Sequence, residues 1–255
     1  MSAWLSHFPF ESFVEHEGFV TAYISKEEAH KIVLSDCLDV PYENVKVSAS
    51  VEDIDGQNWN SVWEAQFKPI RVGDWIIRAS FHAHENATHE LIIDPQMSFG
   101  TGHHATTQLM LSQVLQLSCN KKTVLDVGTG TGVLAILAKK LGAANVFGID
   151  IEDWCVENAK ENALKNGVSD INFSLDELSS FQTKFDIIIA NINRNVLIQH
   201  LPKYAKLLNG NGVILLSGFH EKDIAILKEL AHTHGLRCEN ETEKEDWICL
   251  KFLLS

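Results

Sequence analysis

Short hydrophobic runs alternate with segments of helical periodicity over most of the chain. Strands are predicted where the runs are bounded by turn residues, over 90–93, 123–127, 145–149, 171–175, 185–190 and 212–217. Apolar residues recur at helical spacing between them, and helices are predicted over 106–117, 133–141, 153–166, 196–208 and 221–234. Strands that alternate with helices favour a parallel sheet with helices on both faces.

The C-terminal end departs from this alternation. Strands are predicted at Leu236–Cys238 and Trp247–Leu253, separated only by the acidic segment ENETEKED. A parallel return needs a crossover of about a dozen residues or more, so we expect an antiparallel hairpin with an acidic turn. The predicted fold is α/β: a doubly wound, mostly parallel, Rossmann-like sheet of seven strands.

The first part of the chain has a different pattern of apolar and polar residues. Apolar stretches at 19–24 and 45–51 flank a helical-looking segment, 26–39, that Pro41 closes. This pattern indicates a small α+β domain. The predicted organisation is therefore a small domain over 1–55, a linker over 56–68 and the α/β domain over 69–255.

Composition narrows the functional classes. The 255 residues include no apolar run of the roughly 18 residues that span a membrane, and the N-terminus lacks the pattern of a secretory signal. We therefore expect a cytoplasmic protein. The net charge of −13 disfavours nucleic acid as a partner. It either attracts a basic partner or serves only solubility.

Cysteine and histidine spacing does not indicate a metal or a disulfide framework. The 5 cysteines form no CxxC pair. The 12 histidines lack carboxylate or thiolate partners at matched spacing, so no metal site is predicted.

The strongest local signal is VLDVGTGTG, in which a predicted strand runs through Gly128, Gly130 and Gly132 into a helix. Glycine lets a backbone turn sharply and approach a ligand, and a helix N-terminus offers free N–H donors. Asp150 ends the next predicted strand, where a carboxylate can accept hydrogen bonds from both hydroxyls of a ribose. The alternative is a tight turn followed by a helix-capping aspartate.

These features suit either NAD or S-adenosylmethionine, since both contain adenosine. The spacing here is GxGxG, whereas a pyrophosphate-binding loop has GxGxxG. The terminal hairpin and the lack of a second mononucleotide-binding half favour S-adenosylmethionine and a class I methyltransferase.

Four motifs carry a family resemblance: FGTGHHATT, VLDVGTGTGVLAI, GIDIE and ANI, which begin at Phe99, Val124, Gly148 and Ala190. They resemble the methyltransferases of ribosomal protein L-eleven (L11), the PrmA family. The segment 58–74, with Trp59 and Trp63, is similar to that family's linker. The resemblance covers residues 56–255.

The resemblance implies transfer of methyl groups from S-adenosylmethionine to lysine side-chain and/or N-terminal amino groups of L11. Separately, we expect the protein to be a monomer. The resemblance further implies substrate recognition by the N-terminal domain. It also implies a loop that closes over the methionine part of the cofactor, at Phe99, Gly100, Thr101 and Gly102. The implied cofactor-binding positions are Thr107, Gly128, Gly130, Asp150 and Asn191.

Two features depart from the family pattern. The family's recognition domain usually begins with a full strand, whereas this chain is expected to begin at the following helix. Positions 104 and 105 are His and Ala, where the family often has a proline.

Asn191 is the candidate for positioning the acceptor. Enzymes that methylate nucleic acids or glutamine amides carry Asn/Asp-Pro-Pro-aromatic here, whereas this chain reads Asn-Ile-Asn-Arg, which disfavours a planar acceptor. Alternatively, Asn191 only caps the following helix. No strong general base is identifiable. Other functions left open are methylation of another protein or a small-molecule amine, NAD-dependent oxidoreduction, and non-catalytic nucleotide binding.

Overall fold

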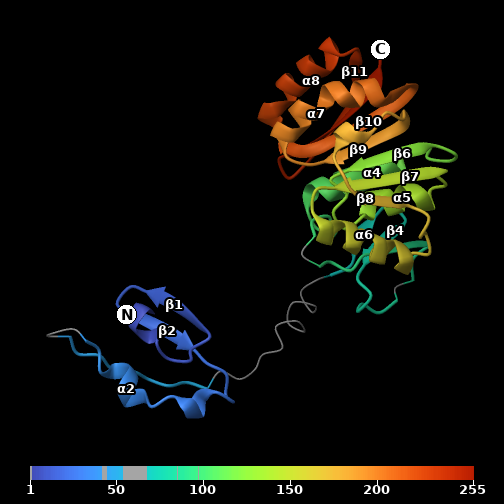
Figure 1. Cartoon of the computed structure of the whole chain (residues 1–255). Helices are drawn as coiled ribbons and strands as arrows, with labels where there is room; N and C mark the ends of the chain where they lie inside the picture. The colour runs from blue at the N-terminus through green and yellow to red at the C-terminus, as the bar shows by residue number, and fades with distance from the viewer. Residues whose placement is uncertain (1, 42–44, 54–67, 85, 97) are drawn as a thin grey trace. The chain divides into compact units, whose positions relative to one another are not determined.

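The computed structural model describes residues 2–41, 45–53, 68–84, 86–96 and 98–255, and it divides into two compact units, Met1–Trp59 and Asn60–Ser255 (Figure 1). The predicted linker, except Lys68, lies outside the described residues, as do Trp59 and Trp63.

The first unit is a small α+β structure. Strands β1 (Ser12–His16) and β2 (Phe19–Tyr23) pair as an antiparallel hairpin. Short helices precede and follow it: α1 (Ser2–Leu5), η1 (Ala29–Lys31) and α2 (Leu34–Leu38). The Trp4 indole N–H donates to the Cys37 carbonyl at 3.0 Å, which joins the first helix to the last.

Two sequence predictions fail in this unit. The helix expected over 26–39 is two short helices, because the β-branched residues Ile32 and Val33 adopt extended backbone angles between them. The apolar stretch 45–51 forms no strand. Val45 and Val51 are exposed, so this stretch gains no burial that would stabilise a strand.

A seven-stranded sheet organises the second unit, in the order β11-β12-β10-β9-β6-β7-β8. Its parallel strands are β6 (Thr123–Val127), β7 (Asn145–Asp150), β8 (Asn172–Leu175), β9 (Phe185–Asn191) and β10 (Leu208–His220). Strand β12 pairs antiparallel with both β10 and β11. The predicted α/β fold and its seven strands are confirmed.

Helices cover both faces of this sheet (Figure 1). One face packs against α4 (Ala105–Leu115), α5 (Val133–Lys140) and α6 (Asp153–Lys165). The other face packs against α7 (Arg194–Leu207) and α8 (Ile224–Thr233), with the short helices η2 (Leu178–Ser180) and η3 (Glu221–Asp223) preceding β9 and α8. Among the described residues, no helix has the length and apolarity needed to cross a bilayer.

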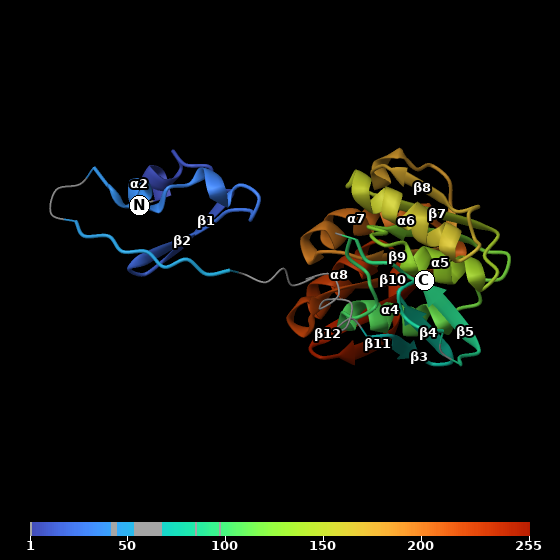
Figure 2. The ribbon, with the colours of Figure 1, turned by 90° about the horizontal axis from the view of Figure 1, so that it is seen from below.

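A separate three-stranded sheet precedes the large one along the chain. It contains β3 (Ile70–Val72), β4 (Trp75–Arg78) and β5 (His89–Ile92), and it lies beside α4 (Figure 2). The strand predicted at 90–93 therefore exists but belongs to this smaller sheet, and β3 and β4 were not predicted.

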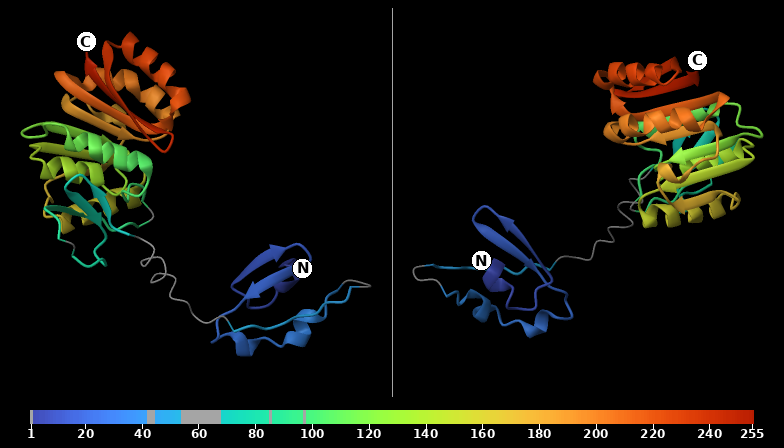
Figure 3. Two further views of the ribbon diagram at one scale, coloured as in Figure 1. Left: turned by 180° about the vertical axis from the view of Figure 1, so that it is seen from behind. Right: turned by 45° about the horizontal axis from the view of Figure 1, so that its top comes forward.

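The C-terminal hairpin is antiparallel, as predicted, but its acidic segment is not a turn. Strand β11 runs from Leu236 to Lys244 and β12 from Trp247 to Leu254, so only Glu245 and Asp246 make the turn. Charged side chains are tolerated because β11 is the edge strand, where they discourage pairing with another chain (Figure 3).

Candidate active site

The glycine loop leaves β6 through backbone conformations that L-residues avoid. Gly128, Gly130 and Gly132 have φ of 71°, 53° and 80°. A Cβ at Gly128 would lie 2.3 Å from Ile192 Cγ2, and one at Gly130 would lie 2.2 Å from the Phe99 carbonyl oxygen. Both positions therefore require glycine for their conformation and for their space.

Asp150, at the end of β7, is held directly against this loop. Its Oδ2 accepts a hydrogen bond from the Gly130 N–H at 2.9 Å, and its Oδ1 accepts one from the Glu152 N–H at 3.2 Å. Helix α6 has Glu152 at its N-cap position. The alternative in which Asp150 caps this helix is therefore wrong.

Asp126 is a second carboxyl at the loop, and it was not among the candidate residues predicted from sequence. It is fully buried and accepts a hydrogen bond from the Thr129 hydroxyl at 2.8 Å. Burial, helped by the nearby Asp150 charge, raises the pKa of Asp126 to about 7. The available signal was an acid within the otherwise apolar strand VLDV.

The segment that includes Phe99, Gly100 and Thr101 is attached to the glycine loop. The Thr131 N–H donates to the Phe99 carbonyl at 2.9 Å, and the Thr131 hydroxyl donates to the Gly100 carbonyl at 2.6 Å. Phe99 is 54% exposed. Thr101 instead contacts His103, with 3.1 Å between its Oγ1 and the ring Nδ1.

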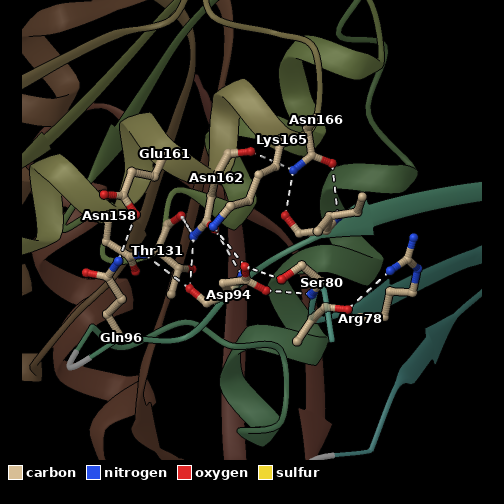
Figure 4. Close-up of polar contacts among 12 residues, drawn as sticks. Arg78, Ser80, Asp94, Gln96, Thr131, Asn158, Glu161, Asn162, Lys165 and Asn166 are labelled. Atoms are coloured by element: carbon tan, nitrogen blue, oxygen red, sulfur yellow. Dashed lines mark hydrogen bonds and ion pairs between the residues drawn. The ribbon is translucent and has the colours of Figure 1, made fainter. Parts of the chain in front are cut away.

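A polar network fixes Asp94, which precedes Phe99 in the chain (Figure 4). The Asp94 carboxylate accepts hydrogen bonds from the Ser80 N–H and hydroxyl, both at 2.6 Å, and pairs with Lys165 at 2.8 Å. The Asn162 amide joins the backbone of Asp94 to the Thr131 carbonyl. Helix α6 therefore holds both Asp94 and the glycine loop.

Asn191 ends β9, and β9 is the neighbour of β6 in the sheet. Its Oδ1 is buried, with no hydrogen-bond partner among the described residues. The cap of α7 is Asn193, whose side chain accepts the Asn195 N–H at 2.9 Å. The alternative that Asn191 only caps this helix is therefore wrong.

Thr107 lies in the first turn of α4, which directly follows the 99–104 segment. It is fully buried, and its Oγ1 has no hydrogen-bond partner in the described part of the chain. An unpaired buried hydroxyl is unfavourable unless it meets another polar group.

A hollow of about 500 Å³ opens where β6, β7 and β8 end, against one side of α7. Ile151, which follows Asp150, lines it on the sheet side, and Asp176 and Glu177 line it after β8. Among the described residues, no three side chains of His, Cys, Asp or Glu are grouped so that they could hold a metal ion.

The match to a protein family decides between the classes that this geometry allows. The model of the family described as ribosomal protein L11 methyltransferase (PrmA) matches residues 6–254. This chain belongs to that family. A relative from Phocaeicola vulgatus with that name is 40% identical and is aligned over 100% of this chain and 92% of its own length. One from Porphyromonas gingivalis is 43% identical over 99% and 89%.

Solved structures agree with this assignment. The ribosomal protein L11 methylase of Lactobacillus delbrueckii subsp. bulgaricus has a TM-score of 0.68 and 30% identity, and the match covers 73% of this chain and 98% of that one. A methyltransferase from Pyrococcus furiosus, at 18% identity and TM-score 0.55, supports the fold alone; it covers 64% of this chain and 88% of its own.

Family membership confirms three of the expectations from sequence. The chain is an S-adenosylmethionine-dependent methyltransferase, its cofactor is S-adenosylmethionine, and its class I fold is the expected one. The NAD-dependent and non-catalytic alternatives have no support from these comparisons. The roles of individual site residues stay predictions.

Proposed function

We propose that this enzyme transfers methyl groups from S-adenosylmethionine to lysine side-chain and/or N-terminal amino groups of ribosomal protein L11. The observation that carries the proposal is the hydrogen bond from the Gly130 N–H to the Asp150 carboxylate. It places a carboxylate beside a loop of glycines, which have no side chains, at the edge where the parallel strands have their carboxyl ends. Ligands of open α/β sheets bind at that edge.

The residues present fit the cofactor. The Asp150 carboxylate keeps lone pairs that can accept the ribose hydroxyls, because each of its oxygens accepts one backbone N–H. The hollow beside it has room for a nucleobase, with Ile151 as an apolar wall. Thr107 Oγ1 and Asn191 Oδ1 are buried polar atoms without partners among the described residues, as expected of atoms that bind a polar ligand.

S-adenosylmethionine, when bound, supplies a sulfonium methyl group to in-line displacement by an unprotonated amine. Phe99, Gly100 and Thr101 form the segment that would cover the methionine part, and the exposed Phe99 ring would exclude water from it. Asn191 Oδ1 would accept a hydrogen bond from the acceptor amine and direct its lone pair. An amide oxygen does not take a proton at neutral pH, so the ammonium proton would pass to water before the transfer.

Charge and organisation support the choice of acceptor. The net charge of −13 suits a basic protein partner and disfavours direct contact with nucleic acid. We assign substrate recognition to residues 1–55, with 56–68 as a linker and 69–255 as the catalytic domain. The enzyme acts as a monomer in the cytoplasm, where ribosomal proteins are made.

Calorimetry with S-adenosylmethionine and, separately, NAD tests the cofactor. Mass spectrometry of a ribosomal protein mixture after incubation with S-adenosylmethionine tests the substrate. We expect methyl groups on L11 alone, removed when Asp150 is replaced by alanine. Methylation of another protein, or of a free amine only, would overturn the choice of substrate while leaving the methyltransferase assignment intact.

A further inference from the structure

A tight turn places Lys244 and Trp247 next to each other at the edge of the active site. Lys244 ends β11, Trp247 begins β12, and the two residues are paired in register. The turn residues Glu245 and Asp246 have φ of 52° and 65°. Two-residue hairpin turns with positive φ match the natural twist of the strands, so this turn fixes the two side chains relative to each other.

Lys244 reaches across to the helix that follows the 99–104 segment. Its ammonium donates a hydrogen bond to Gln108 Oε1 in α4. The Gln108 amide in turn donates to the His103 carbonyl at 3.0 Å. These two hydrogen bonds link the hairpin to the C-terminal end of the segment. The first is charge-assisted and therefore stronger than a neutral hydrogen bond.

Trp247 makes a second, independent link. Its ring lies 4.8 Å from the His104 ring at 66°, and the His104 ring lies 5.3 Å from the Phe99 ring at 61°. Both are edge-to-face geometries that aromatic pairs prefer. The Trp247 ring also lies 4.0 Å from the His220 ring at the end of β10. A row of four rings therefore runs from the large sheet to Phe99.

The segment is held at several points, among them the His103 ring, whose Nε2 lies 2.9 Å from the Lys68 carbonyl oxygen, and the hairpin contacts add to these because the segment contains two flexible glycines. Gly100 and Gly102 have φ of 99° and 93°, and glycine has the largest conformational freedom of all residues. Thr131 holds the beginning of the segment through hydrogen bonds to the Phe99 and Gly100 carbonyls. The other end of the segment continues into α4, which packs on the large sheet, and the contacts of Lys244 and Trp247 link that end to the hairpin as well.

We propose that Lys244 and Trp247 are positioning residues, which hold the 99–104 segment against the glycine loop and thereby retain S-adenosylmethionine in the site. Lys244 acts through Gln108, and Trp247 acts through His104. This inference rests on the proposed placement of the cofactor under that segment. It assigns a role in cofactor retention to the hairpin, which contributes none of the cofactor-binding positions predicted from sequence.

Stopped-flow measurement of the S-adenosylmethionine dissociation rate tests the proposal on the full chain. We expect Lys244→Met and Gln108→Met each to raise that rate about tenfold, with the double variant no faster than the faster single one, because both remove one link. Trp247→Leu should also speed release, whereas Trp247→Phe keeps a ring and should restore most of the retention. KM for S-adenosylmethionine should rise more than kcat falls.

Lys251→Met is the matched control. Lys251 lies in the same hairpin and pairs with Glu239 at 2.7 Å, so the variant removes an ion pair of the hairpin without touching the segment. Its dissociation rate should equal that of the wild type. The proposal is overturned if S-adenosylmethionine dissociates from Lys244→Met as slowly as from Lys251→Met. It is also overturned if the effects of Lys244→Met and Gln108→Met on the dissociation rate are strictly additive.

Binding of S-adenosylmethionine and turnover by the wild type distinguish a failure of this inference from a failure of the proposed function. Failure of the wild type to bind S-adenosylmethionine would overturn both. Normal binding and turnover by the wild type, with no change in the variants, would overturn only the positioning role. Thermal unfolding of each variant shows whether faster release comes from a local change, since a variant that keeps the Tm of the wild type has kept its global stability.

Discussion

The Gly130 N–H donates a 2.9 Å hydrogen bond to the Asp150 carboxylate, so the glycine loop after β6 and the acid that ends β7 form one unit. These residues are 20 apart in the chain. Parallel pairing of β6 with β7 brings them together, because the carboxyl ends of neighbouring parallel strands lie at the same edge. The carboxylate therefore both orders the loop and faces the proposed ribose site.

Replacing Asp150 separates these two roles. Asp150→Ala should weaken S-adenosylmethionine binding by about 1.5–3 kcal/mol, the scale of a hydrogen bond to a charged group. Asp150→Asn keeps an oxygen for the Gly130 N–H but has one acceptor oxygen instead of two, so its loss should be smaller. Calorimetry gives both values, and unchanged affinity in Asp150→Ala would contradict the ribose role.

Gly128→Ala should prevent tight cofactor binding. Its Cβ would meet Ile192 Cγ2 at 2.3 Å, and an alanine at φ 71° costs about 1–2 kcal/mol in backbone strain. The clash pushes the loop after β9 away from the glycine loop. Calorimetric affinity and thermal unfolding, measured together, distinguish loss of the site from loss of the fold.

Gly167→Ala provides the control for strain alone. Gly167 has φ of 70°, and nothing lies within 4 Å of an added Cβ. This variant should lose stability through the same backbone strain and bind S-adenosylmethionine normally. If both alanine variants bind equally well, the contact with Ile192 has no bearing on the cofactor.

Asn191 and Asn193 should respond in opposite ways to alanine. Asn193→Ala removes the cap of α7 and should cost about 1 kcal/mol of stability with little change in the methyl-transfer step. Asn191→Ala removes an oxygen without a partner among the described residues, so stability should be kept while kcat falls roughly a hundredfold through misplacement of the acceptor. Single-turnover kinetics and thermal unfolding test the pair, and equal kcat in the two variants would remove Asn191 from the mechanism.

The large sheet could be predicted from the sequence because its strands are short, apolar and separated by periodic helices. The prediction for β6 has the same bounds as the structure, Thr123–Val127. The length of the hairpin strand β11 was underestimated because acidic residues alternate along it. A charged residue is compatible with a strand at the edge of a sheet. Strand β3 was missed because its 3 residues are too few to show a period. Strand β4 was also missed, although strands were predicted at β5 and β8, which are equally short.

Parts of the candidate site could be predicted from sequence where the backbone conformation requires a particular type of residue. Glycines with positive φ at positions 128 and 130 are such a case. Contacts between distant segments leave no such local signal. The links of Lys244 to Gln108 and of Trp247 to His104 depend on how the hairpin packs against α4, which no short-range pattern shows.

Asp126 should make stability depend on pH in an unusual direction. Its pKa is about 7 in the folded protein, raised from 3.8 chiefly by burial. Between these values the folded state holds a proton that the unfolded state has lost, so this carboxyl lowers stability as pH rises from about 4 to about 7. The full effect is up to about 4 kcal/mol.

Asp126→Asn isolates this contribution. The amide oxygen can still accept the Thr129 hydroxyl, but the side chain no longer titrates. The stability gain of Asp126→Asn over the wild type should therefore be larger at pH 8 than at pH 5, as measured by urea unfolding. A constant difference between these pH values would mean that Asp126 does not titrate in this range.

Removal of residues 1–59 tests whether the first unit recognises the substrate while the second unit binds the cofactor and transfers the methyl group. The remaining unit, Asn60–Ser255, contains both hydrophobic clusters of the large sheet and every cofactor position named above, so it should fold and bind S-adenosylmethionine like the full chain. Its kcat/KM on intact L11 should fall at least about tenfold, because binding energy remote from the reacting amine is what positions that amine.

Salt then shows how recognition works. If the acidic chain attracts a basic substrate, kcat/KM of the full enzyme should fall as salt is added, since charges are screened beyond about 8 Å at physiological ionic strength. The fragment should show a weaker dependence, because part of the acidic surface has been removed. Calorimetry on both proteins controls for cofactor binding. Full activity of the fragment on L11 would place recognition in the catalytic domain and leave the N-terminal unit without the role proposed for it.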